Sequence, residues 1–248
     1  MICLLRPIAI VLATGLMAVP PGLAARYDDC VATVNAVPET GFEAARSWVE
    51  EDDDPAARHC LALALVRLGR FEEAASELTK LVDASAAAPV HHQVSLLSQA
   101  GQAWILAGAP ALAEAAFARA LTLTPDDPDL LIDRARARAD RDDYWGAVED
   151  LDAALDIAPG RDDAFAFRAA AYRRLEFPDL AADDVTRALA HNPSNVDALL
   201  ERAILALAVD AVAAARTDLS RVLLTDPTSK AAALAREFLT ALDAKDGL

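Results

Sequence analysis

Small and large apolar residues recur along this chain at a fixed interval of 34 residues. The small positions are Gly101, Ala135, Ala169 and Ala203 in one column, and Ala113, Ala147, Ala181 and Ala215 in another. The large position is Leu121, Leu155, Leu189 and Leu223, and a proline column follows it at Pro125, Pro159, Pro193 and Pro227. A further copy, Ala62, Ala74, Leu78 and Val82, lies 39 residues earlier, which indicates about five added residues. The pattern predicts an array of repeats.

Each 34-residue unit has room for two helices of about a dozen residues and two short turns. The small residues allow the two helices to approach closely, and the large ones fill the space beside them. The prolines end the second helix, because proline lacks an N–H and disfavours helix in the residue before it. Asp54 and Asp127, each followed by proline, predict helix N-caps, and Asn195 predicts another.

A lone helix pair cannot cover its own apolar face, so the units must stack into an all-α solenoid. The columns place five units at 55–88, 94–127, 128–161, 162–195 and 196–229. A degenerate helical unit at 26–54 precedes them, and an amphipathic segment at 230–248 predicts the helix that caps the far end.

Two short stretches depart from the repeat. Residues 37–41 contain a proline and a glycine and predict a turn, after which Thr40 and Glu43 have the spacing of a capping box. Residues 89–93 carry the adjacent histidines His91 and His92 and predict a lengthened loop. Adjacent histidines rarely bind a metal without further ligands, so no metal site is predicted there.

The columns resemble those of the tetratricopeptide repeat family over residues 55–229. The resemblance is clearest in one unit, at Gly101, Trp104, Gly108, Ala113, Phe117, Ala120 and Pro125. It departs at the column of Trp104, where Arg138 and Ala206 replace the aromatic residue that the family often has. The resemblance implies a right-handed solenoid whose concave groove is lined by the first helix of each unit.

The charge restricts the classes of partner. The formal net charge is −16, which argues against nucleic acid because phosphates would be repelled. Hydrophobic residues make up 54% of the chain, although aromatic residues make up only 5%. The surplus is largely alanine, as closely packed helices require. An acidic surface of this kind serves mainly for solubility.

The N-terminus predicts an export signal. Arg6 supplies a positive charge, residues 8–19 form an apolar run, and residues 22–25 offer a small-residue cleavage site. Twelve helical residues span only about 18 Å, too little for a hydrocarbon core of about 30 Å. We therefore expect a signal peptide at 1–25, a mature chain that begins at Ala25 or Arg26, and a periplasmic or secreted location. An uncleaved membrane anchor is the alternative.

Cysteine usage agrees with export. Removal of the signal peptide leaves Cys30 and Cys60, an even pair in an oxidising compartment. If the degenerate unit is aligned so that Trp48 matches Leu78, the two cysteines fall at equivalent places on successive first helices. We predict a disulfide between them, with two buried free thiols as the alternative.

No motif for catalysis accompanies the repeat. The sequence has no Gly-rich phosphate loop, no G-x-S-x-G elbow, no C-x-x-C and no H-E-x-x-H. His91 with Ser95 and His191 with Ser194 fall at helical spacing, but neither pair has an orienting acid or an oxyanion hole. We expect no enzymatic activity and no cofactor.

One charged pattern follows the repeat. Arg134, Arg168 and Arg202 lie on first helices, and Asp150, Asp184 and Asp218 lie on second helices with the same period. The matching periods predict bidentate ion pairs between packed helices. The alternative is a ladder of arginines that binds a ligand.

The resemblance to tetratricopeptide repeats also implies which residues lie near the groove. These are Ser98, Gln102, Ile132, Arg136, Arg173, Leu200, Ile204 and Leu207. The groove would then have a cationic middle and an apolar end, suited to a peptide with a carboxylate and aliphatic anchors. The alternative is that the arginines only neutralise Asp140 and Asp163.

The predicted function is non-catalytic binding of a protein or peptide in this groove. The alternatives are a self-associating scaffold, and an accessory subunit of a cell-envelope complex.

Overall fold

A computed structural model describes residues 21–246 of the chain, and all the regular structure in that range is helical. The first helices are α1 (Pro21–Ala36), α2 (Pro38–Glu51), α3 (Pro55–Arg67), α4 (Phe71–Ala84), α5 (Val90–Leu106) and α6 (Pro110–Leu123). The repeat continues with α7 (Pro128–Ala139), α8 (Tyr144–Ile157), α9 (Asp162–Arg174), α10 (Pro178–His191), α11 (Val196–Ala208), α12 (Val212–Thr225) and α13 (Lys230–Asp246).

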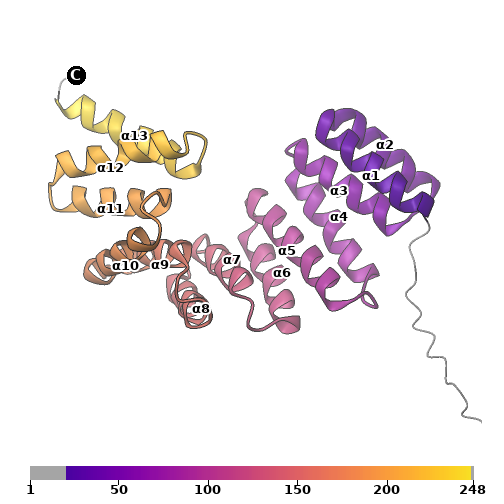
Figure 1. Cartoon of the computed structure of the whole chain (residues 1–248), viewed down its shortest axis with the longest axis horizontal. Coiled ribbons are helices and arrows are strands. Elements are labelled where there is room, and N and C mark those ends of the chain that lie inside the picture. The colour runs from indigo at the N-terminus through magenta and orange to yellow at the C-terminus, as the bar shows by residue number, and fades with distance from the viewer. Residues whose placement is uncertain (1–20, 247–248) are drawn as a thin grey trace, which may run out of the picture.

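The helices form a curved stack with α1 and α13 at opposite ends (Figure 1). Each odd-numbered helix packs against the even-numbered helix that follows it. Several odd-numbered helices also contact each other directly, as in α1 with α3, α7 with α9 and α9 with α11, whereas no two even-numbered helices make comparable contact. The odd-numbered helices therefore line the inner, concave side, and the even-numbered helices form the convex side.

Side-chain caps begin three of the odd-numbered helices as predicted. The Asp54 carboxylate accepts a hydrogen bond from Ala56 N at 2.7 Å, and Asp127 accepts one from Asp129 N at 3.0 Å. Asn195 accepts one from Ala198 N at 2.8 Å. These bonds satisfy N–H groups that have no partner inside the helix.

The turn between the two helices of each unit has one geometry throughout the repeat. In all five turns, one residue precedes the second helix directly. Its N–H donates to the carbonyl five residues earlier, as in Arg70 to Leu65 and Phe177 to Tyr172. This is the Schellman motif, whose penultimate residue needs a positive φ. The residues at that position are Gly69, Gly108, Asp142, Glu176 and Asp210, with φ between 58° and 72°.

Helix approach within a unit depends on matched side-chain size. A Cβ atom built on Gly101 would lie 2.6 Å from the ring of Phe117, so only glycine fits opposite that ring. The next units have Ala135 at the glycine position and Leu151 at the phenylalanine position, and both are buried. Glycine thus faces the larger phenylalanine, and alanine faces the smaller leucine, so the two sizes compensate across the helix pair.

Two sequence expectations are wrong. Residues 37–41 do not form a turn, because α1 ends at Ala36 and α2 begins directly at Pro38 after one extended residue. Proline is well suited to the first position of a helix, so Thr40 lies inside the helix and does not cap it. Residues 90–93 are likewise helical: α5 begins at Val90 and has 17 residues, so the inserted residues lengthen this helix and not the loop.

Cys30 and Cys60 form a disulfide, with an S–S distance of 2.05 Å and a Cα–Cα distance of 6.4 Å. The bond joins α1 to α3, inside a core cluster that includes Val34, Ala45 and Trp48. It is the pairing that the repeat alignment predicts, and it ties the degenerate unit to the first regular one.

The periodic arginines and aspartates form bidentate ion pairs between helices. Arg134 Nε and Nη2 donate to the two oxygens of Asp150 at 2.9 and 2.6 Å. The equivalent pairs are Arg168 with Asp184 and Arg202 with Asp218, all with N–O distances of 2.7 Å. All three aspartates are buried, so each pair satisfies a carboxylate that water does not reach.

The C-terminal helix α13 covers the last unit. Ala231, Ala232 and Ala235 are buried in a cluster with apolar residues of α11 and α12. The helix therefore closes the apolar end of the stack, as a terminal cap must.

Candidate functional site

The concave face of α5, α7, α9 and α11 carries the residues that the sequence assigns to a groove. Gln102 and Arg136 are exposed there, and Ser98, Ile204 and Leu207 are half-buried. These five residues lie on the inner helices, as expected for a surface that a partner could contact.

Two of the predicted groove residues belong to the core. Ile132 is 3% exposed and Leu200 is 5% exposed, and both pack in the apolar clusters. The reason is the direct contact between successive inner helices, which covers the side of α7 and of α11 that faces a neighbour. Ile132 and Leu200 are therefore excluded as contact residues.

Arg136 belongs to a small polar cluster in the middle of the face. Its Nη1 donates to Asp133 Oδ1 at 3.4 Å, and Gln102 Nε2 donates to Asp133 Oδ2 at the same distance. The guanidinium also lies 5.3 Å from the centre of the Phe167 ring. The cluster thus links α5, α7 and α9, and leaves Arg136 with a weak, exposed ion pair.

Arg173 does not offer a free positive charge. Its Nε and Nη2 donate to the two carboxylate oxygens of Glu201 at 2.5 and 3.1 Å, and the Glu201 side chain is only 9% exposed. Arg173 therefore neutralises a nearly buried acid on α11, which is neither of the two acids proposed from the sequence. Asp163, one of those two, pairs with Arg161.

In the middle of the concave face, carboxylates therefore lie beside both predicted arginines: Asp133 beside Arg136, and Glu201 beside Arg173. Burial raises the pKa of Asp133 and of Asp197 above the ordinary value for aspartate, against the nearby charge of Arg136. Asp197 has no hydrogen bond or ion pair within the described part of the chain. A partner that supplies a positive charge would stabilise these carboxylates.

A deeper hollow lies nearer the N-terminal end of the same concave side. It has a volume of about 640 Å³ and lies between α1, α3 and α5, at the indigo and purple end of the stack in Figure 1. Its apolar walls include Leu23, Leu81 and Leu96, and Asp28 and Asp54 also line it. We call it the N-terminal pocket.

A chain of hydrogen bonds crosses the N-terminal pocket. Tyr27 Oη lies 2.7 Å from His59 Nδ1, and His59 Nε2 lies 2.9 Å from Gln99 Oε1. Gln99 Nε2 in turn donates to Ser95 Oγ at 3.2 Å. The Gln99 oxygen can only accept, so Nε2 of the imidazole carries the proton and Nδ1 accepts from the Tyr27 hydroxyl.

The electrostatics of the pocket agree with this arrangement. Burial lowers the pKa of His59, and the positive charge of nearby His92 lowers it further, although the bond to Gln99 opposes both effects. Burial and the Asp28 carboxylate raise the pKa of the Tyr27 hydroxyl. Imidazole and phenol are therefore both neutral at pH 7, and they present fixed donors and acceptors without charge.

The sequence interpretation did not identify Tyr27, His59 or Gln99. The signal for His59 was present, because it lies 39 residues before Ser98 and so occupies the same repeat column. The signal for Tyr27 was weaker, since α1 keeps none of the diagnostic columns.

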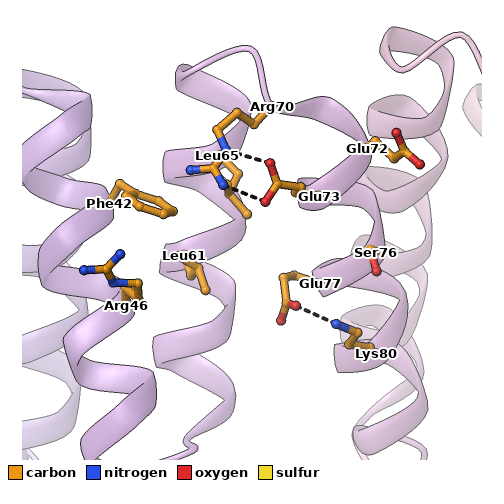
Figure 2. Close-up of a pocket in the computed structure, with 10 residues that line it drawn as sticks. All are labelled: Phe42, Arg46, Leu61, Leu65, Arg70, Glu72, Glu73, Ser76, Glu77 and Lys80. Atoms are coloured by element: carbon orange, nitrogen blue, oxygen red, sulfur yellow. Dashed lines mark hydrogen bonds and ion pairs between the residues drawn. The ribbon is translucent and has the colours of Figure 1, made fainter.

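A second hollow lies on the convex side, between α2 and α4 (Figure 2). Arg70 and Lys80 form ion pairs there with Glu73 and Glu77 at 2.6 and 2.7 Å. Arg70 also lies over the Phe42 ring, 4.6 Å from its centre. Apart from Glu72, the charged side chains that line this hollow form ion pairs within the protein, so it offers less to a ligand than the N-terminal pocket does.

Two further features of the described residues concern metal ions and the membrane. Between residues 21 and 246, His, Cys, Asp and Glu side chains do not gather in a group of three that could hold a metal ion. In the same range, no helix is both long enough and apolar enough to cross a bilayer. The predicted signal peptide lies mostly outside the described residues, which begin at Pro21 within it.

Solved structures share this fold at low sequence identity. A tetratricopeptide repeat protein from Parabacteroides merdae is 15% identical, with a TM-score of 0.68 over 91% of this chain and 86% of that one. MamA from Desulfovibrio magneticus is 16% identical, with a TM-score of 0.61 over 72% and 99%. YrrB, described as a tetratricopeptide repeat protein with an unusual peptide-binding site, is 17% identical, with a TM-score of 0.51 over 79% and 99%.

Sequence comparison identifies the family directly, although no curated protein matches the chain. The tetratricopeptide repeat family model matches residues 61–128 and 168–233, together more than half of the sequence. The family match, the helix pairs and the repeated Schellman turns agree with one another. The chain therefore belongs to the tetratricopeptide repeat family.

Proposed function

We propose that this protein is an exported, non-catalytic binding protein that holds a peptide segment of another protein on its concave face. The observation that carries the proposal is the N-terminal pocket, which combines apolar walls with fixed hydrogen-bonding groups on the concave side. Pockets of this kind take one or two side chains of a ligand and fix their orientation.

The family and the rest of the face support this proposal. Tetratricopeptide repeats are interaction folds, and YrrB, which shares the fold, is described by its peptide-binding site. The acidic middle of the concave face favours a partner segment that carries positive charge.

The proposed location rests on the sequence and on the disulfide. Arg6, the apolar run at 8–19 and the small residues at 22–25 have the order of a signal peptide. The bond between Cys30 and Cys60 would persist in an oxidising compartment. Intact-mass measurement of the protein isolated from its native host tests this location, with a mature chain that begins at Ala25 or Arg26 as the expected result. A full-length, membrane-embedded chain would contradict it.

Crosslinking in intact cells tests the binding function. A photoreactive residue in place of Ser98 on the concave face should capture a discrete partner, and mass spectrometry should place the contact in a short segment of it. The same residue in place of Glu149 on α8 is the matched control and should capture less. Equal capture from both positions would contradict binding on the concave face.

Self-association as a scaffold is the second candidate, and an exposed aromatic pair favours it. The side chains of Trp145 and Phe177 are 56% and 42% exposed, with ring centres 5.8 Å apart in an edge-to-face arrangement. Exposed aromatic residues are typical of interfaces. Sedimentation at micromolar concentration tests this alternative: a stable oligomer that Trp145→Ser dissociates would favour a scaffold.

A further inference from the structure

The N-terminal pocket has room for more than one side chain. Its volume of about 640 Å³ lies within the range of about 300–1,000 Å³ that is usual for ligand sites. Leu23, Pro55 and Ala56 supply apolar surface, whereas Leu81 and Leu96 lie behind it and are each only 1% exposed. An aromatic or branched aliphatic side chain would gain by leaving water there.

The hydrogen-bond chain gives the pocket a direction. Tyr27 donates to His59, His59 to Gln99 and Gln99 to Ser95, so the Ser95 hydroxyl hydrogen remains available for a ligand acceptor. At the opposite end, the Tyr27 oxygen can still accept, beside Asp28. A ligand therefore meets a donor at the α5 end and acceptors at the α1 end.

Near the pocket, the arginines have ion-pair partners, but one carboxylate does not. The arginines closest in sequence are engaged, because Arg26 pairs with Glu51 at 2.7 Å and Arg58 pairs with Asp53. Asp28 is exposed, lines the pocket and has no ion pair within residues 21–246. The α1 end of the pocket thus carries a carboxylate that forms no ion pair within residues 21–246.

We propose that the N-terminal pocket anchors a peptide by one aromatic or branched aliphatic side chain with a basic residue next to it. The apolar side chain packs against Pro55, Ala56 and the Tyr27 ring, and the lysine or arginine meets Asp28. This inference rests on the proposed function, since it specifies which segment of a partner the concave face recognises. It also replaces the carboxylate-bearing peptide that the sequence suggested.

Removal of the predicted signal peptide would shorten the apolar wall of this site but keep its polar groups. Leu23 and Ala24 would be lost, so the pocket would open further at its α1 end. The hydrogen-bond chain and Asp28 come from residue 27 onward. The disulfide lies directly beneath, because Cys30 is one helical turn from Tyr27 and Cys60 follows His59. The bond therefore holds the two halves of the site together.

Fluorescence anisotropy with a defined probe tests the inference. The probe is a labelled eleven-residue peptide of glycine and serine with one phenylalanine between two lysines at its centre. We expect the full-length protein to bind it at least tenfold more tightly than a peptide with alanine for the phenylalanine. A peptide with glutamates for the lysines should be weakened by a similar factor.

Matched protein variants locate the site. Asp28→Lys should weaken binding at least tenfold, whereas Asp29→Lys, an exposed neighbour with the same change in charge, should alter it by less than twofold. Ser95→Tyr should obstruct the pocket, whereas Thr122→Tyr places similar bulk at an exposed position of α6 on the convex side and should leave binding unchanged. Circular dichroism melting confirms that each variant is folded.

Three results would overturn the inference: no saturable binding by the folded wild-type protein, equal binding by Asp28→Lys and Asp29→Lys, or equal binding by Ser95→Tyr and wild type. The proposed function fails separately, when crosslinking captures no partner on the concave face. Capture of a partner together with failure of the probe would leave the function standing and remove the pocket as its anchor.

Discussion

The two ends of the repeat are held together by different means. From α7 to α12, each unit contains the same arginine–aspartate pair between its two helices. From α1 to α5 this pair is not repeated: Arg58 of α3 pairs with Glu77 of α4 at 2.9 Å from another position, and a disulfide and the hydrogen bonds of Tyr27, His59 and Gln99 join α1, α3 and α5. In the periodic part, the hollow that includes Arg136 and Phe167 has a volume of about 90 Å³, whereas the N-terminal pocket of the irregular part has a volume of about 640 Å³.

The unit 94–127 shows what the periodic pair contributes. It has Ala100 and Ala116 at the positions of Arg134 and Asp150, and both alanines are buried. The same helix-pair geometry therefore forms without any charge at this place. The ion pair is one of two ways to fill the position, and its loss matters mainly when a single partner is left unpaired.

The largest expected effect is at the disulfide. In Cys30→Ala/Cys60→Ala, the bond that closes a loop of 30 residues is absent, which should lower stability by about 3–4 kcal/mol in the chain-entropy model. In a solenoid each unit contacts only its neighbours, so amide exchange should increase in α1 and α2 and stay nearly unchanged in α11 and α12. A uniform loss of protection along the chain would contradict the separation of the two regions.

The second expected effect ranks the ion pairs. Arg168→Ala would leave Asp184, whose side chain is 3% exposed, without its main partner, at a cost of about 1–3 kcal/mol. Arg202→Ala should cost less, because the Arg202 side chain is already 45% exposed. Urea unfolding measures both. A larger loss in Arg202→Ala would show that burial does not control the contribution.

A double-mutant cycle identifies the partner of Arg168. Arg168→Ala should couple with Asp184→Ala and be additive within about 0.5 kcal/mol with Asp150→Ala, since Asp150 pairs instead with Arg134 and Arg138. The sequence alone left both aspartates open as partners. Coupling of equal size to both would mean that the column acts as one network.

A further prediction gives unit 128–161 the alanine pair found in unit 94–127. Arg134→Ala/Asp150→Ala recreates the alanine pair of unit 94–127, so it should be about 1 kcal/mol more stable than Arg134→Ala alone. Thermal unfolding compares the two variants. If the double variant were the less stable one, the ion pair would contribute more than the satisfaction of a buried acid.

The smallest expected effect concerns pH and the N-terminal pocket. Burial lowers the pKa of His59 in the folded protein, so the unfolded chain binds a proton first as the pH falls through about 6.5. Protection of α1 should therefore decrease from pH 7 to pH 5. The charged and titratable groups that line the pocket with His59 are Tyr27, Asp28, Asp54 and His92.

The control for this titration is another histidine. His59→Gln should remove most of the pH dependence of α1 protection, whereas His91→Gln, at an exposed position of α5, should leave it unchanged. Amide exchange at several pH values measures both. Equal profiles for the two variants would assign the dependence to other groups.

The sequence predicts the periodic region well, for a physical reason. Columns at 34-residue spacing record contacts that every unit repeats, so the arginine–aspartate pairing could be predicted from spacing, although not which aspartate each arginine binds. The alternation of small and large residues likewise encodes the approach of the two helices. Family and fold follow from such repeated signals.

The irregular contacts could not be read in this way. Glu201 accepts a hydrogen bond from Arg173 of the preceding unit, and this pair does not recur at the 34-residue spacing. The start of α5 depended on whether five inserted residues extend a helix or a loop, which packing decides. Ile132 was assigned to the groove from its column, although contact between inner helices buries it.

The repeated Schellman turns have a consequence for heat resistance. Gly69 and Gly108 adopt the left-handed conformation freely, but Asp142, Glu176 and Asp210 hold it at a cost of about 1 kcal/mol each. The turn persists in those three units because the paired helices and the 6→1 bond impose it. Glycine at these positions, above all at Glu176, would raise the melting temperature of the array while leaving both of its faces as they are. The melting temperature of this protein is therefore lower than its fold would allow.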